Sequence, residues 1–255
     1  MRTACADSNP PSDPWLARPG EGEPLLVRVL GPVRVQAGRS VGRPRRTATA
    51  ELIAYLALQR EGATQDRLLE MLWPAQDPRR TRARLWQGVS EARRLLGPAL
   101  RRQGGLYRLD WTQTAVDVDS VEAALRLPPE ARPERVEQAL ALFQGQPLEG
   151  IDGAWAAGHL RRLTALLAAL CERASRLYLD RLEPARALLA AERGLSLDEL
   201  NERLTRLAMQ AEQDMGLRLA VAARYETLRS LLAERLGLEP ARETRLLYHR
   251  LLAQS

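Results

Sequence analysis

The sequence contains no lysine, so all 38 of its basic residues are arginines. A GC-rich genome, whose codons favour arginine, alanine, glycine and proline, accounts for that total without reference to function. Aromatic residues make up only 4% of the chain, so leucine and alanine must fill most of the interior. Both residues favour the helix, and the composition therefore favours a mainly helical fold. Hydrophobic residues make up 45%, which argues against wholesale disorder.

Two cysteines and two histidines are too few for several classes of protein. Cys5 and Cys171 cannot form a disulfide framework. A bridge between them stays open, but Cys171 lies in an apolar helical run and is predicted to be a small buried hydrophobe. His159 and His249 show no metal-ligand spacing with the cysteines, so we expect no metal and no other cofactor.

Long apolar runs are also missing. No uncharged apolar stretch reaches about 18 residues, the length that would indicate a transmembrane helix. Residues 1–24 lack the apolar core of a signal peptide. We therefore expect a cytoplasmic, nucleoid-associated protein that has no contact with a membrane.

The positive charge is concentrated in one segment. Between Leu25 and Thr112 there are 17 arginines against 7 acidic residues, a net charge of +10, whereas residues 1–24 and 113–255 each carry −2. Such asymmetry favours a polyanion-binding domain beside a nearly neutral one. Residues 1–24 hold five prolines and several acids, and we predict a disordered tail there.

The basic segment alternates short β-branched runs with amphipathic stretches. These patterns predict strands at residues 26–30, 33–35 and 40–41, helices at 47–59, 65–73 and 79–96, and a β-hairpin within 100–111. Thr64 is the expected N-cap of the second helix, Gly97 ends the third, and Gly104-Gly105 is the expected hairpin turn. Three helices flanked by hairpins predict a winged helix-turn-helix DNA-binding domain over residues 25–112.

From residue 117 onward the pattern is almost wholly helical. The expected helices are 120–127, 133–143, 155–178, 183–193, 197–215, 217–236 and 241–252. Helix pairs of this size predict an all-α, TPR-like helical-repeat domain over residues 117–253. Asp117 and Asp119 are interpreted as a helix start rather than as a catalytic carboxylate pair.

The helix expected at residues 79–96 divides its faces as a DNA-reading helix must. On a wheel of about 100° per residue, Leu85, Val89, Ala92 and Leu96 share one buried face. Arginine and glutamine predominate on the other side, and these side chains match guanine and adenine bidentately in the major groove. The predicted DNA contacts on this helix are Arg79, Arg80, Arg82, Arg84, Trp86, Gln87, Ser90, Glu91, Arg93 and Arg94.

The following hairpin would lie over the adjacent backbone or minor groove. Its predicted contacts are Arg101, Arg102, Tyr107 and Arg108. A basic outer helical face is most often simply solvated. Here Glu91 is the sole acid of the helix, and the basic hairpin comes next, which favours DNA. Glu91 has two interpretations. It accepts a hydrogen bond from cytosine N4, or it orients a neighbouring arginine through a helical ion pair, which is the preferred interpretation.

At these residues the sequence resembles the SARP-type regulators, which join an OmpR-type winged helix to a bacterial transcriptional activator domain (BTAD). The resemblance covers about residues 26–253. Its motifs are RVLGPVRV at 28–35, TQDRLLEMLWP at 64–74, the recognition helix at 85–97, GLYRL at 105–109, VDVD at 116–119, LNERL at 200–204, YETLR at 225–229 and LAERLGLEP at 232–240. In the family the second half packs as TPR-like helices.

The resemblance implies a regulator that binds promoter direct repeats in double-stranded DNA, as a dimer or tandem pair, and recruits RNA polymerase. The sign of regulation stays open, as does whether the helical half binds a small molecule, a partner helix or a second subunit. No Walker-type glycine loop is present, and we expect no enzymatic activity.

Three departures from the family keep an alternative function open. Gly88 and Glu91 stand where relatives often carry a DNA contact and an arginine, and Trp86 is bulky for its position. A TPR-like interaction adaptor with a degenerate winged helix would show such changes.

Overall fold

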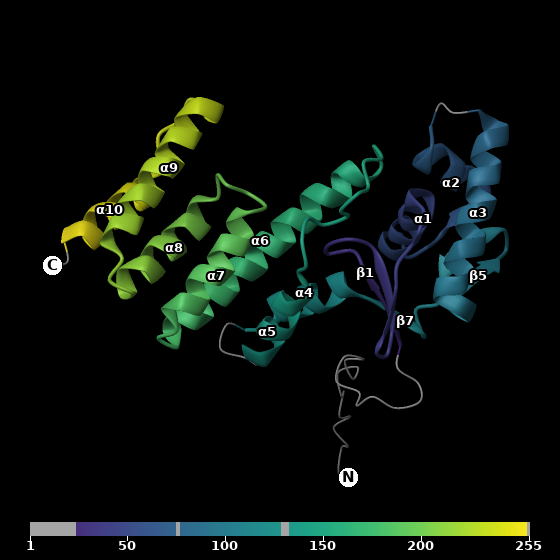
Figure 1. The fold of residues 1–255 in the computed structure, drawn as a ribbon, viewed down its shortest axis with the longest axis horizontal. Coiled ribbons are helices and arrows are strands. Elements are labelled where there is room, and N and C mark those ends of the chain that lie inside the picture. The colour runs from purple at the N-terminus through teal and green to yellow at the C-terminus, as the bar shows by residue number, and fades with distance from the viewer. Residues whose placement is uncertain (1–23, 75–76, 129–132, 254–255) are drawn as a thin grey trace, which may run out of the picture. The chain divides into compact units, whose positions relative to one another are not determined.

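The computed structural model describes residues 24–74, 77–128 and 133–253, and these fall into two compact units (Figure 1). The N-terminal unit comprises the described residues up to Arg28 together with Val33–Val116. The C-terminal unit comprises Val29–Pro32 together with the described residues from Asp117 onward. The predicted tail and Cys5 lie outside the described residues, apart from Pro24. The chain passes from one unit to the other three times, after Arg28, after Pro32 and after Val116.

The first sheet of the N-terminal unit has the strand order β3-β2-β1-β7. Its strands are β1 Leu25–Arg28, β2 Arg34–Ala37, β3 Ser40–Gly42 and β7 Thr114–Val116. β1 pairs antiparallel with β2, and β2 with β3, which confirms the three predicted strands. β7 pairs in parallel with β1, so that Ala115 lies opposite Leu26. β7 was not predicted from the sequence, because three residues are too few to show a period.

The second sheet contains the predicted hairpin and has the order β4-β6-β5. Its strands are β4 Ala63–Thr64, β5 Leu100–Gln103 and β6 Leu106–Leu109. The turn is Gly104-Gly105, as expected, and both residues have positive φ, at 58° and 80°. Glycine adopts this conformation without the steric penalty of a side chain.

Three helices, α1 Thr47–Leu58, α2 Gln65–Leu72 and α3 Pro78–Leu96, complete this unit, and a short 3-10 helix, η2 Gly97–Ala99, follows α3. α1 is buried along nearly its whole length and forms the centre of the core. The side chain of Thr64 accepts from the N–H of Arg67 at 3.2 Å, which confirms it as the N-cap of α2. α3 ends at Gly97, also as expected.

The C-terminal unit is built from helices, and Figure 1 shows α6 with α7 alongside it, followed by α8 and α9. The bounds are α4 Asp117–Arg126, α5 Pro133–Leu142, α6 Ala156–Asp180, α7 Pro184–Leu195, α8 Glu202–Asp214, α9 Arg218–Leu236 and α10 Arg242–Ala253. α8 begins five residues later than predicted because Asn201 caps it, accepting from the N–H of Leu204 at 3.1 Å. These helices follow one another in close contact, as predicted for a helical repeat.

Asp117 explains why β1 is shorter than expected. Its buried carboxylate accepts from the backbone N–H of Val29 at 2.9 and 3.1 Å and from that of Leu30 at 2.9 Å. The N–H groups of Gln144 and Leu148 in turn donate to the carbonyls of Leu30 and Val29. The backbone of 29–30 thus bonds to the rest of the C-terminal unit, of which it is part, instead of extending the β1–β2 ladder.

Cys171 lies at the centre of the C-terminal unit and is fully buried, which confirms the prediction for this residue. Burial raises the pKa of its thiol to about 12. A Cβ at Gly194 of α7 would lie 2.9 Å from the Cβ of Cys171 and 2.5 Å from a methyl of Leu204. α6, α7 and α8 therefore pack closely at this point, where a side chain has no room.

Candidate nucleic-acid interface

The inner face of α3 packs against α1. Leu85, Val89, Ala92 and Leu96 are at most 3% exposed, which confirms the predicted buried face. Gly88 lies on the same side, where a Cβ would meet the carbonyl oxygen of Ala48 at 3.6 Å. In this chain the close approach of α1 therefore covers the position of Gly88.

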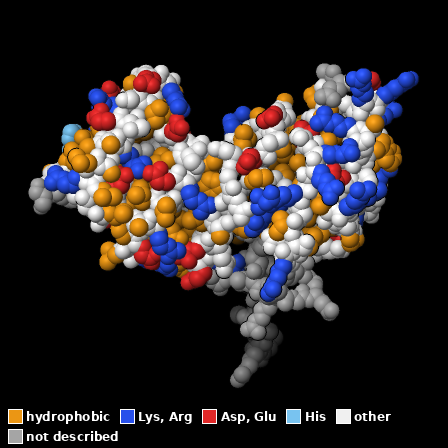
Figure 2. Space-filling model, in the orientation of Figure 1, with side chains coloured by type: hydrophobic (Ala, Val, Ile, Leu, Met, Phe, Trp, Pro, Cys, Tyr) orange, Lys and Arg blue, Asp and Glu red, His pale blue; other side chains and the backbone are white. Residues whose placement is uncertain are grey.

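The opposite side of α3 is open to solvent. Its exposed polar and aromatic residues are Arg79, Arg80, Arg82, Trp86, Gln87, Ser90, Arg93 and Arg94. Within the described part of the chain, Arg79, Arg82, Arg93 and Arg94 have no carboxylate partner, and Arg80 lies 4.0 Å from Asp77. Figure 2 shows basic side chains gathered over the N-terminal unit with few acidic ones among them. This surface can therefore accept anions without first breaking strong ion pairs.

Arg84 differs from the other arginines of α3. It is half-buried, with its guanidinium 3.5 Å from the carboxylate of Glu51 and 4.7 Å from the ring centre of Trp73. Trp73 also donates to Glu51 at 2.8 Å. Arg84 thus ties α3 to α1 and to the end of α2, and it is less available to a ligand than the sequence analysis predicted.

Most of the predicted DNA contacts of the wing hairpin interact with other residues of the hairpin or with the residue that follows it. Arg101 pairs with Asp110 at 2.5 Å, and the guanidinium of Arg102 lies 5.2 Å from the ring centre of Tyr107. Hydrogen bonds from Thr112, followed by the charge of Arg101, lower the pKa of Asp110 although burial opposes them. Arg101 and Arg102 remain exposed.

Two predicted wing contacts are less accessible. Arg108 is half-buried and donates to Gln103. Tyr107 is only 2% exposed, because this position of β6 faces the core. Its placement among the surface contacts is therefore wrong, and its ring instead supports Arg102.

Glu91 does not orient an arginine along its own helix, so that preferred interpretation is wrong. Its carboxylate accepts from the backbone N–H of Arg45 at 2.7 Å and from the buried hydroxyl of Thr49 at 2.7 Å. Partial burial alone would raise the pKa of Glu91, but the bonds from Thr49 and Arg45 and the charges of Arg46 and Arg45 lower it overall. Glu91 thus fastens the start of α1 to α3.

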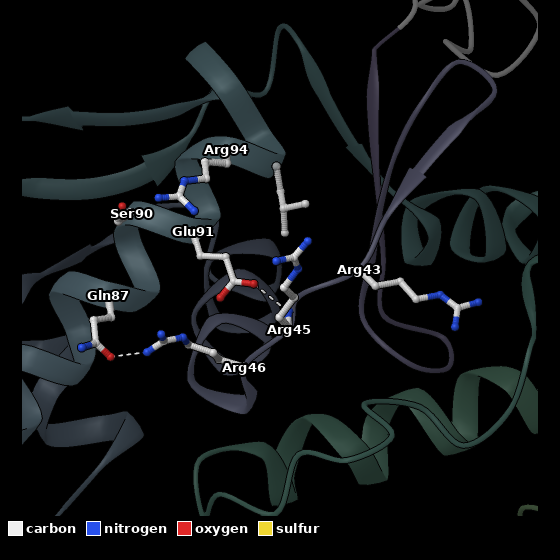
Figure 3. A pocket seen from close by; sticks show the side chains of 8 residues that line it. Arg43, Arg45, Arg46, Gln87, Ser90, Glu91 and Arg94 are labelled. Atoms are coloured by element: carbon white, nitrogen blue, oxygen red, sulfur yellow. Dashed lines mark hydrogen bonds between the residues drawn. The ribbon is translucent and has the colours of Figure 1, made fainter.

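The connection between β3 and α1 brings further arginines beside α3. Arg43, Arg45 and Arg46 line a hollow of about 420 Å³ together with Gln87, Ser90, Glu91, Arg94 and Leu95 (Figure 3). Arg46 donates to the side-chain oxygen of Gln87, and Figure 3 shows the side chain of Arg43 pointing away from the others.

These three arginines were missing from the sequence-based prediction. The dense RPRR run at 43–46 is the one sequence feature that marks them. No local pattern shows that Arg46 meets Gln87, 41 residues further along the chain.

Other kinds of site find no support in the described ranges, 24–74, 77–128 and 133–253. They contain no grouping of His, Cys, Asp and Glu that could hold a metal ion. No helix within them has both the length and the apolar character needed to cross a bilayer. His159 stacks edge-on against Trp155, and His249 is exposed.

A winged helix-turn-helix with a basic outer helix, joined to a helical-repeat unit, is the architecture of a transcriptional regulator. Residues 109–252 match the family model of the bacterial transcriptional activator domain. The chain belongs to this family of SARP-type bacterial regulators, as the sequence resemblance indicated.

Two curated relatives agree with this family. The chain is 30% identical over 249 residues to the regulatory protein AfsR of Streptomyces griseus, and 28% identical over 247 residues to AfsR of Streptomyces coelicolor. These matches cover 92% and 90% of this chain but only 25% of each relative, so the chain spans a quarter of their length.

A solved structure shares the fold. EmbR of Mycobacterium tuberculosis, solved with a low-affinity phosphopeptide, superposes with a TM-score of 0.68 at 20% identity. The match covers 91% of this chain and 65% of EmbR. It confirms the predicted fold class, a winged helix-turn-helix followed by a helical domain.

Proposed function

We propose that the N-terminal unit binds double-stranded DNA sequence-specifically through the outer face of α3, and that the chain regulates transcription by this means. The observation that carries the proposal is the row of exposed arginines on α3 that lack carboxylate partners among the described residues. An α-helix fits the major groove, where guanidinium groups bind guanine edges and phosphates. The exposed arginines of the wing, Arg101 and Arg102, would hold the flanking backbone.

Membership of the family supports the finer elements of the proposal. The chain would bind direct repeats at promoters in the cytoplasm, as a dimer or tandem pair, and its C-terminal unit would help to recruit RNA polymerase for activation. The curated relatives are named regulatory proteins, which agrees with this role.

Enrichment of genomic fragments on the purified protein at about 150 mM salt tests the proposal, because surface charges are then screened beyond roughly 8 Å. We expect one motif, repeated at a spacing near a helical turn of about 10 base pairs. Weak binding without a motif would contradict sequence-specific regulation and would favour the adaptor alternative.

A charge-matched pair of variants separates the proposed surface from general electrostatics. Arg93→Ala with Arg94→Ala removes two exposed charges from α3, whereas Arg242→Ala with Arg250→Ala removes two exposed charges from α10. If about six phosphates are neutralised, the slope of log K against log salt is near −5, and each lost phosphate contact makes it shallower by about 1. We expect the α3 pair to flatten the slope and the α10 pair to leave it unchanged. Equal effects of the two pairs would contradict the proposal.

A further inference from the structure

Gln87 is the one side chain on the outer face of α3 that, by itself, would indicate adenine. A glutamine amide matches adenine because its oxygen accepts from N6–H while its nitrogen donates to N7. Both halves of the amide are needed for that match. What Gln87 can recognise therefore depends on whether its oxygen is free.

Arg46 engages that oxygen. Its guanidinium donates to Oε1 of Gln87 (Figure 3). An arginine carries donors and no acceptor, so the amide must turn its oxygen, not its nitrogen, toward Arg46. The guanidinium takes one of the two lone pairs of Oε1, and the other groups that this pair offers to a ligand are donors: the Nε2 hydrogens of Gln87 and the remaining N–H groups of Arg46.

The position of Arg46 is held by a neighbouring contact on the same helix. One turn beyond Gln87, Glu91 binds the backbone N–H of Arg45 and the hydroxyl of the fully buried Thr49, both at 2.7 Å. These bonds fasten the residue before Arg46, and a residue three positions after it, to α3. The reach of Arg46 to Gln87 therefore starts from a fixed backbone.

Guanine and adenine respond differently to a surface that mainly donates. Guanine presents two acceptors, N7 and O6, in the major groove, whereas adenine presents the acceptor N7 beside the donor N6–H₂. Next to the guanidinium of Arg46, adenine N6–H₂ meets other donors and a positive charge, and an N–H group left unpaired on binding is costly. Guanine finds donors for both of its acceptors.

We propose that Arg46 and Gln87 form one donor-rich reading unit that selects guanine over adenine, with Glu91 as the residue that positions it. This inference rests on the proposed function, since it assigns a base preference to the DNA-binding surface. It predicts that a residue outside the helix-turn-helix helices α2 and α3 sets the specificity of a residue within α3.

Full-length protein and the Arg46→Met variant should be compared on a randomised DNA library at fixed salt. Methionine keeps an unbranched side chain but cannot donate, so Oε1 of Gln87 becomes free to accept from adenine N6. We expect one position of the motif to change from guanine toward adenine, with the affinity ratio falling by about tenfold or more, the range that a bidentate contact supplies. Arg46→Lys retains a donor for Oε1 and should keep guanine.

The matched control is Arg43→Met, which removes the same charge from the same connection at a side chain that points away from Gln87. It should weaken binding to all sequences alike or leave it unchanged. A second readout uses 7-deazaguanine, which lacks the N7 acceptor. Wild type should bind it roughly fivefold or more weakly at the affected position, and Arg46→Met should be less sensitive to it.

The outcomes separate the inference from the proposed function. If wild type enriches a motif but Arg46→Met keeps the same purine preference at every position, the donor-rich unit is wrong while DNA-binding regulation stands. A uniform loss of affinity in Arg46→Met would likewise overturn the inference, because it would make Arg46 a phosphate contact. If wild type enriches no motif, the proposed function itself fails.

Discussion

Removal of the Asp117 carboxylate should destabilise the C-terminal unit more than any exposed acid does. Asp117 is fully buried, and the N–H groups that it accepts from belong to Val29 and Leu30, which are at most 1% exposed. Asp117→Ala leaves both N–H groups without this acceptor. An orphaned buried group costs about 1–3 kcal/mol, so we expect the free energy of unfolding to fall by roughly 3 kcal/mol.

Asp117→Asn should lower the free energy of unfolding less than Asp117→Ala does. Oδ2 of Asp117 accepts from both N–H groups at 2.9 Å, whereas Oδ1 makes one bond of 3.1 Å to Val29. An asparagine carbonyl placed at Oδ2 keeps both shorter bonds, so the loss should be about 1 kcal/mol. Asp214→Asn is the control, because Asp214 is exposed at the end of α8, where a negative charge opposes the helix dipole.

Thermal denaturation of the full chain and hydrogen exchange at Val29 and Leu30 measure these effects. A loss of about 3 kcal/mol lowers the midpoint of a unit of this size by roughly 6–12 °C. Exchange at Val29 and Leu30 should accelerate in Asp117→Ala and less in Asp117→Asn. If Asp117→Ala keeps the wild-type midpoint and exchange rates, the carboxylate does not hold this segment.

Three further predictions concern other residues. Gly62→Ala should destabilise more than Gly104→Ala: both glycines have positive φ, which alone costs a side chain about 1–2 kcal/mol, but a Cβ at residue 62 would lie 2.4 Å from the carbonyl oxygen of Tyr107, while none lies within 4 Å at 104. Equal thermal midpoints would contradict this. Because the pKa of Glu91 is lowered on folding, the stability that it contributes is present above its ordinary value of 4.5 and is lost as pH falls through the lowered value. The stability difference between wild type and Glu91→Gln in urea titrations should therefore hold from pH 7 to about 5 and shrink below; a constant difference down to pH 3 would oppose it. Cys171, whose pKa burial raises to about 12, should resist iodoacetamide at pH 8 until the protein unfolds, as followed by mass spectrometry of its peptide. Rapid alkylation of the folded chain would disprove its burial.

Local patterns were sufficient for much of the fold. The N-cap at Thr64, the end of α3 at Gly97 and the turn at Gly104-Gly105 each depend on a few adjacent residues, and all three were predicted. The buried face of α3 followed from helical periodicity in the same way. Such features are encoded within one or two turns of the chain.

The features that could not be predicted depend on partners distant in sequence. Asp117 bonds to residues 87 and 88 positions earlier, which periodicity cannot reveal. Glu91 was placed in an ion pair on its own helix, but Thr49 and Arg45 lie closer in space. That α1 covers Gly88 could not be predicted, because resemblance says nothing of how closely α1 approaches in this chain.

The short segment 29–32 has a consequence for the modular history of such proteins. It interrupts two strands of the N-terminal unit, yet its backbone bonds to Asp117 and to the 144–148 region of the C-terminal unit. A recombination event with a single breakpoint after residue 112 would take β1 and residues 29–30 from one parent, and their partners β7 and Asp117 from the other. We therefore expect productive chimaeras between relatives to inherit residues 25–32 and the region from β7 onward from one parent. The two units would then be exchanged together and not as independent domains.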